Sequence, residues 1–202
     1  IIEKIPGGLG CIMRMVLRVF FSDVGTSFTR GILLHTQNRP DDFVATGMFA
    51  GVLADLVGHK EITNWKGHNG VRCCLECGNM TYHRAPKAGE ITIACSDPSK
   101  FKMRSDDEIY KIIEDMRSGR LTWGIGVFKE FQVTSGFNYD PHGLRFDRGL
   151  RLIYKPAHHT IRDWMHTVSQ DGVANTHIAH VMHTLDEVCN IKPARVIEFA
   201  GL

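Results

Sequence analysis

The residues best suited to chemistry in this sequence are cysteines clustered within a few positions of one another. Cys74 and Cys77 are separated by two residues, in the run Val-Arg-Cys-Cys-Leu-Glu-Cys-Gly-Asn. Zinc in structural sites takes four ligands in a tetrahedron, and a Cys-x-x-Cys turn supplies two thiolates from one short loop. We therefore predict a structural zinc ion that is bound by Cys74 and Cys77.

Further ligands are expected close to this turn. Cys95 follows a short alternating apolar run, and a hairpin at that point can return its thiol to the turn. The fourth ligand stays open among three histidines, namely His68, His83 and His166. Three other interpretations remain: the cysteines are buried core residues, the pair is redox-active, or Cys73 replaces Cys74.

Two carboxylates also stand in a chemically suggestive setting. Asp55 interrupts the apolar run Gly-Val-Leu-Ala-Asp-Leu-Val-Gly, where burial is costly unless a partner or a metal compensates the charge. Asp163 precedes His166 by three residues, so on a helix one of the two can ligate a metal while the other orients it. The plainer alternatives are a polar helix face for Asp55 and a helix cap for Asp163.

The composition is that of an ordinary globular protein, with 43% hydrophobic and 23% charged residues. The net charge of +2 does not indicate a general polyanion binder, but positions 60–104 hold eight basic against four acidic residues. No apolar run approaches the roughly 20 residues that cross a bilayer, and the first residues lack a signal-peptide pattern. The sequence starts without Met, so we expect it to be part of a longer polypeptide. We also expect the protein to be intracellular.

Hydrophobic periodicity predicts alternating helices and short strands. The predicted helices cover positions 11–21, 43–57, 106–119 and a stretch from about 176 onward. The predicted strands cover positions 31–35, 91–94 and 150–154, whereas 127–133 fits either type. The clearest signal is a capping box, in which Ser105 precedes Glu108 by three residues. The fold class is therefore α/β or α+β.

The last predicted helix carries three histidines at helical spacing, His177, His180 and His183. At about 100° per residue these side chains fan out opposite the apolar side of the helix. We therefore expect them to face solvent or a partner and not to form a metal site.

Several motifs, taken in order, resemble one protein family. They are Ile5-Pro6-Gly7-Gly8, Leu53-Ala54-Asp55, Trp65-Lys66-Gly67-His68-Asn69-Gly70, Cys74-Leu75-Glu76-Cys77-Gly78-Asn79, Cys95-Ser96-Asp97-Pro98-Ser99, Asp163-Trp164-Met165-His166 and Gly172-Val173. Their order is similar to that of transposase-derived proteins of eukaryotic DNA elements, in particular the Kyakuja–Dileera–Zisupton and Plavaka-like DDE transposases. The resemblance spans nearly the whole chain.

This resemblance implies an RNase H-like core with a zinc-binding insertion, in a nuclear protein that cleaves and transfers DNA strands. Positions 1–59 would be a partial core truncated at its N-terminus, 60–104 the insert, and 105–202 a mixed, largely helical continuation. Asp55 matches the second catalytic carboxylate, which holds Mg²⁺, and Cys74 and Cys77 match the family's cysteine pair. Asp163 and His166 match its Asp-x-x-His motif, whose histidine is a zinc ligand candidate.

The sequence also departs from the family pattern. The first catalytic carboxylate is expected upstream of Ile1, and His177 stands near the position where related proteins often carry an acid. We therefore expect this chain alone to lack catalytic activity. Basic residues of the insert are candidates for salt-dependent contacts with DNA phosphates, namely Lys66, Arg72, Arg84, Lys87, Lys100 and Lys102.

Two alternative functions stay open. One is a non-catalytic, zinc-stabilised module that binds DNA or protein. The other is an unrelated zinc-dependent nuclease in which His158 or His159 acts as general base.

Overall fold

A computed structural model describes residues 6–22, 27–35, 41–82, 87–163 and 173–187, together with Asn190 and Lys192. The chain divides into two compact units. Unit 1 comprises Ile1–Val52 and Leu56–Ile161, and unit 2 comprises Leu53–Asp55 and Arg162–Leu202.

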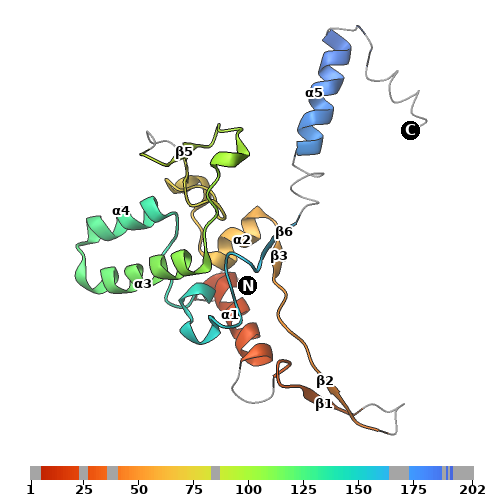
Figure 1. The fold of residues 1–202 in the computed structure, drawn as a ribbon, viewed down its shortest axis with the longest axis vertical. Helices are drawn as coiled ribbons and strands as arrows, with labels where there is room; N and C mark the ends of the chain where they lie inside the picture. Colours follow the sequence, from red (N-terminus) through yellow and green to blue (C-terminus); the bar gives the residue numbers. More distant parts are fainter. Residues whose placement is uncertain are drawn as a thin grey trace. The chain divides into compact units, whose positions relative to one another are not determined.

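The elements mix helices with very short strands (Figure 1). The α-helices are α1 (Gly8–Phe21), α2 (Leu56–Thr63), α3 (Asp106–Thr122), α4 (Ile125–Ser135) and α5 (Val173–Glu187). The strands are β1 (Ile32–Leu34), β2 (Phe43–Ala45), β3 (Val52–Ala54), β4 (Met80–Thr81), β5 (Ile91–Thr92) and β6 (Thr160–Arg162). Single 3₁₀ turns are η2 (Gly67–Asn69), η3 (Pro98–Lys100), η4 (Leu144–Phe146) and η5 (Arg148–Leu150). This mixed architecture agrees with the α+β alternative of the sequence prediction.

The sheets among the described residues are each two-stranded, with β1 beside β2, β3 beside β6, and β4 beside β5. The pair β1–β2 is antiparallel and the pair β4–β5 is parallel. Backbone bonds between β3 and β6 run from Val52 N to His159 O and from Asp163 N to Ala54 O. The bonded positions rise together along both strands, which is the pattern of a parallel pair.

Helices α1 and α3 form where the sequence predicts helices. Helix α1 begins after Gly7, which adopts a left-handed φ of 80°, and buries Leu17. Helix α3 opens with the predicted capping box: Glu108 N donates to Ser105 Oγ at 3.1 Å, and Ser105 N donates to Glu108 Oε2 at 2.9 Å. These bonds satisfy backbone donors that the first helical turn otherwise leaves without partners.

Two element predictions are wrong, and one that was left open is decided. Positions 43–57 form β2, β3 and the start of α2, because Gly47 and Gly51 weaken a helix and Val44 pairs with Leu33. Positions 150–154 continue the turn of η5, in which Tyr154 N donates to Leu150 O at 2.7 Å. The range 127–133, which was open between two types, lies inside α4.

Helix α3 also runs past its predicted end at Gly119. A Cβ atom at Gly119 would lie 2.3 Å from the ring of Trp123. The glycine therefore allows the Trp123 ring to lie against the helix, and does not terminate it. Helices α3 and α4 then run antiparallel side by side (Figure 1).

The main hydrophobic core lies in unit 1, around the pair α3–α4. Its buried members come from both helices, from the 3₁₀ turn η4 and from three loops, and they are Trp65, Leu75, Ile113, Met116, Phe128, Phe137 and Phe146. Leu75 stands between the two predicted zinc ligands, so the core holds the cysteine-bearing loop in place.

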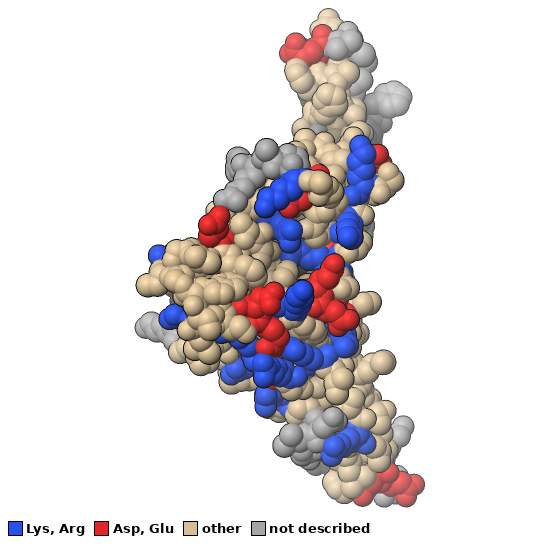
Figure 2. All heavy atoms as spheres, turned by 60° about the vertical axis from the view of Figure 1, so that its left-hand side comes forward, with Lys and Arg blue, Asp and Glu red and all other residues tan. Residues whose placement is uncertain are grey.

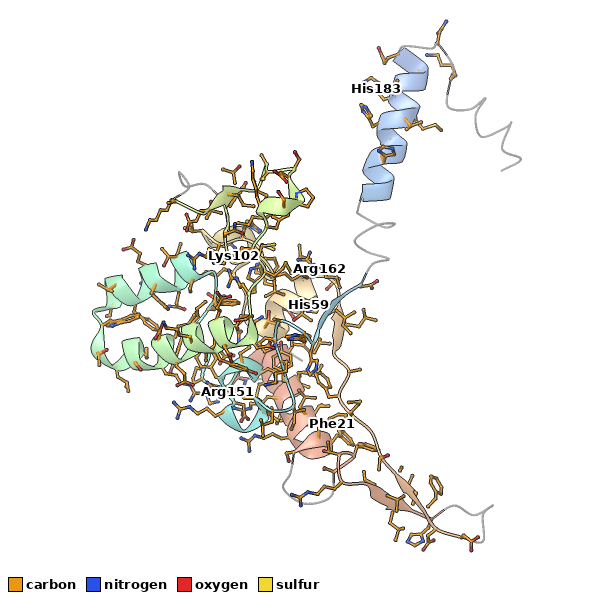
Figure 3. All side chains as sticks on the ribbon, viewed as in Figure 1. Phe21, His59, Lys102, Arg151, Arg162 and His183 are labelled. Atoms are coloured by element: carbon orange, nitrogen blue, oxygen red, sulfur yellow. The ribbon has the colours of Figure 1, made fainter. Side chains whose placement is uncertain are left out.

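Helix α5 lies in unit 2 and exposes His177, His180 and His183, as the sequence predicted; Figure 3 labels His183. No helix within the described ranges is long and apolar enough to cross a membrane.

Candidate metal and nucleic-acid site

The segment 71–79, named here the Cys loop, presents Cys74 and Cys77 on either side of a buried anchor. Leu75 is 3% exposed and anchors the loop in the core. The residues on either side of it form a tight turn. In this turn Cys77 N donates to Cys74 Sγ at 3.1 Å. A backbone N–H that points at sulfur stabilises thiolate charge, which a zinc ligand must carry. This bond is compatible with a thiolate at Cys74, and the zinc ion stays a prediction.

Asn79 fastens the end of the Cys loop to the segments around it. Its Nδ2 donates to Gly89 O at 3.1 Å and to Lys100 O at 2.8 Å, while its Oδ1 accepts from Lys102 N at 2.9 Å. Gly78 N also donates to Lys102 O at 2.8 Å. These bonds join the loop to the segment 100–104, in which Arg104 N donates to Glu76 O at 2.7 Å.

The other predicted zinc ligands do not complete a set of three among the described residues. Cys95 Sγ lies 3.8 Å from Asp97 O, and Cys77 Sγ lies 4.0 Å from the sulfur of Met103. His68 is exposed on η2. His83 and His166 lie outside the described residues, so their part in the site stays a prediction.

Cys73 is the less suitable thiol of the doublet. It is 9% exposed, and burial raises the pKa of its thiol above the usual value of 9.0. The low dielectric of the interior disfavours the thiolate form there. Cys74, which is half-exposed and already accepts a backbone bond, is the better ligand.

A cavity of about 690 Å³ opens beside the Cys loop, walled by that loop, by 87–90, by 102–104 and by helices α3 and α4. Its basic lining residues are Arg72, Lys87, Lys102, Arg104 and Lys111. Its acidic lining residues are Glu90, Glu108 and Asp115. Its apolar lining residues include Val71, Met103, Ile112 and Phe131. We call this cavity the basic pocket; Figure 3 labels Lys102, which contributes to its wall.

Arg104 places a buried positive charge in the wall of the basic pocket. It is 6% exposed, and its guanidinium lies 4.9 Å from the ring centroid of Phe137. Its contacts to Cys77 O and Ser135 O are long, at 3.4 and 3.5 Å, and Nη2 has no hydrogen-bond partner among the described residues. Burial and the charge of Arg145 lower the pKa of Arg104 to about 10, which still leaves it cationic at neutral pH.

Arg145 packs against the same Phe137 ring, with its guanidinium 4.5 Å from the centroid. It is 1% exposed, and burial lowers its pKa. No carboxylate in the described part of the structure forms an ion pair with Arg104 or Arg145, so both charges contribute to a positive interior.

The residues predicted to contact DNA differ in burial and in whether they form ion pairs. Lys66 is half-buried, and burial lowers the pKa of its amine, with a smaller contribution from Lys60. Lys100 forms an exposed ion pair with Asp97 at 3.7 Å, and Arg72 lies 3.5 Å from Glu90. Figure 2 shows basic and acidic side chains interspersed over the face that it displays, so neither sign covers that face alone.

Asp55 and Asp163 follow the two neighbouring strands β3 and β6. Asp55 is the residue after Ala54, and Asp163 N donates to Ala54 O at 3.0 Å. Both carboxylates belong to unit 2 and stand at the carboxyl ends of a parallel strand pair. The sequence singled out each residue, but their adjacency arises from strand pairing across the chain and was not predicted.

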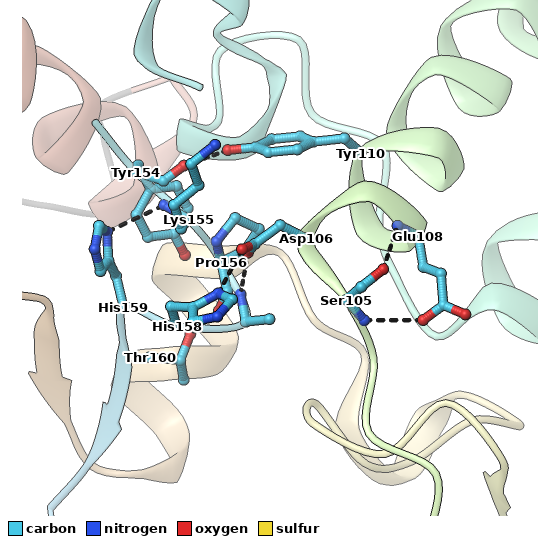
Figure 4. Close-up of polar contacts among 11 residues, drawn as sticks. Ser105, Asp106, Glu108, Tyr110, Tyr154, Lys155, Pro156, His158, His159 and Thr160 are labelled. Atoms are coloured by element: carbon cyan, nitrogen blue, oxygen red, sulfur yellow. Dashed lines mark hydrogen bonds and ion pairs between the residues drawn. The ribbon is translucent and has the colours of Figure 1, made fainter. Parts of the chain in front are cut away.

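The two histidines proposed as nuclease bases have different surroundings (Figure 4). His158 Nδ1 lies 2.5 Å from Asp106 Oδ2, and Asp106 Oδ1 accepts from Ala157 N at 2.7 Å. His159 Nδ1 accepts from Lys155 N at 3.1 Å, and its ring packs edge-on against Phe49. His158 thus has an orienting carboxylate, whereas His159 is held as a neutral, structural ring.

Comparison of the chain with protein-family models, with curated proteins and with solved structures found no match.

Proposed function

We propose that this chain is a DNA-binding part of a DDE-type, transposase-like protein, in which Asp55 is a catalytic metal ligand. The observation that carries the proposal is the position of Asp55 and Asp163 after neighbouring parallel strands. Ligand sites in α/β sheets lie at the carboxyl ends of strands, and paired carboxylates there are suited to Mg²⁺. A divalent ion supplies charge stabilisation at a phosphate that undergoes displacement.

The chain's own residues act on DNA in two ways in this proposal. Asp55 and Asp163 provide oxygen ligands on rigid strand ends, which fixes their separation. Basic side chains near the Cys loop contact phosphates, with Lys102, Lys87 and Arg72 nearest to the basic pocket. Such contacts are mostly independent of base sequence and weaken as the salt concentration rises.

Binding of Mn²⁺, a spectroscopic substitute for Mg²⁺, tests the proposal. We expect electron paramagnetic resonance titration to detect a Mn²⁺ site that weakens at least about tenfold in Asp55→Asn and in Asp163→Asn. Asn preserves the size of each side chain and, at position 55, the ability to cap α2. The control is Asp41→Asn, which changes an exposed acid that lies outside β3 and β6. Equal Mn²⁺ affinity in all four proteins would contradict the proposal.

A non-catalytic, zinc-stabilised DNA-binding module is the second candidate. The N–H···S bond within the Cys loop and the positive charge of the neighbouring pocket favour it. DNA binding that survives Asp55→Asn, in a protein with no Mn²⁺ site, would support this candidate over the catalytic one.

A further inference from the structure

The basic pocket has a cationic wall and an apolar wall. One wall is cationic, with Lys87, Lys102 and Lys111 exposed and without ion pairs to described residues. The other wall is apolar and includes the half-buried ring of Phe131. A volume of about 690 Å³ lies within the range of roughly 300–1,000 Å³ that is typical of small-molecule sites.

The five cations of the pocket outnumber its three acids, so the pocket is only partly neutralised from within. Two of its three acids are already engaged: Glu90 with Arg72 and with Lys87 N at 3.1 Å, and Glu108 in the capping box. The buried guanidinium of Arg104 adds a cation below the surface, where low dielectric strengthens its field. A net positive pocket with an apolar side favours an anion that carries a flat or apolar body.

We propose that the basic pocket binds one nucleoside phosphate unit. The phosphate lies against Lys102 and Lys111, and the base lies against Phe131 and Ile112. Asp115 has no ion pair within the described residues and can accept hydrogen bonds from an exocyclic amino group. Its carboxylate makes an acidic peptide a poorer fit, because acidic side chains would meet it with the same charge. This inference rests on the proposed function, in which DNA is the partner.

The nucleoside phosphate can belong to a nucleic-acid strand or to a free nucleotide, because both offer the same base and phosphate groups. In a strand, the neighbouring nucleotides would follow the basic residues outside the pocket, and stacking on an aromatic ring is tolerant of base identity. A free nucleotide would use the pocket alone.

The test is fluorescence anisotropy with a labelled single-stranded oligonucleotide, competed by dAMP, deoxyadenosine or inorganic phosphate. We expect dAMP to displace the oligonucleotide more effectively than deoxyadenosine or inorganic phosphate does. Lys102→Gln and Lys111→Gln change exposed side chains, so both variants should fold normally. Each should reduce the slope of log affinity against log salt concentration by about one. Phe131→Leu should weaken binding about tenfold or more through lost stacking.

Lys129→Gln serves as the matched control, because Lys129 is an exposed lysine of α4 outside the pocket lining. Tight binding of dAMP alone would assign the pocket to a free nucleotide, and tight binding of the oligonucleotide would assign it to a strand. Unchanged binding in the pocket variants, or equal displacement by inorganic phosphate and dAMP, would overturn the inference. If the protein binds dAMP but has no Mn²⁺ site, only the proposed function is contradicted, and the inference about the basic pocket stands.

Discussion

At the scale of single residues, Gly119 is a position where the missing side chain makes room for an aromatic ring. Its Cα faces the Trp123 ring, and an added Cβ would come within 2.3 Å of it. We expect Gly119→Ala to lower the free energy of unfolding by about 1–2 kcal/mol, since the clash outweighs the gain in helix propensity. Chemical denaturation followed by circular dichroism measures this loss.

Gly126 is the matched control for this substitution. It lies in α4, and no atom is within 4 Å of a Cβ built there. Gly126→Ala should therefore be neutral or stabilise the protein by about 0.4–1 kcal/mol. Equal destabilisation by both changes would contradict the role given to the Trp123 contact.

His159 should make the folded protein less stable as the pH falls. Burial lowers the pKa of its ring below the usual 6.5, so the folded state disfavours the protonated form. Its contribution to stability is complete above pH 6.5 and declines as the pH falls through that value toward the folded pKa. The free energy of unfolding, measured from pH 7.5 to pH 5, should no longer show this decline in His159→Gln. The decline should persist in His68→Gln, which alters an exposed histidine. A slope that is unchanged in His159→Gln would show that other groups cause it.

At the scale of elements, the capping box of α3 is the local feature that the sequence predicted best. Replacing Ser105 by Ala removes the Oγ acceptor of Glu108 N. The change should cost about 1 kcal/mol of stability, whereas Ser118→Ala, at an exposed position within the same helix, should cost little. Comparable losses in the two variants would mean that the cap contributes nothing specific.

The element predictions failed where pairing or packing overrode local preference. Positions 43–57 combine apolar residues at near-helical spacing, yet Phe43 and Val44 pair with the strand β1. Gly119 resembles a helix terminator, but it serves a contact with Trp123 that becomes visible only in three dimensions. Capping, in contrast, involves residues three positions apart, so the sequence alone contains the whole interaction.

At the scale of the whole molecule, the sequence identified individual site residues but not their groupings. Asp55 and Asp163 were each singled out by motif, and only the pairing of β3 with β6 makes them neighbours. Arg72, Lys87 and Lys102 were predicted to contact phosphate, whereas Arg104 and Lys111 were missed. Lys111 could have been found as the polar side of α3, opposite the apolar stripe that begins at Ile109.

At this scale we propose that a zinc ion bound by Cys74 and Cys77 stabilises the Cys loop. The loop has no regular secondary structure of its own, and it is tied to neighbouring segments by backbone bonds and by the side-chain bonds of Asn79. Removing a structural zinc should therefore loosen the basic pocket as well, because Gly78 and Asn79 belong to both.

The most direct measurement is native mass spectrometry of the reduced, folded chain beside the variant Cys74→Ser/Cys77→Ser. The account predicts one zinc ion per wild-type chain and none in the double variant, together with a lower melting temperature for that variant. A folded, reduced wild-type chain without zinc, or a double variant that retains it, would contradict the claim.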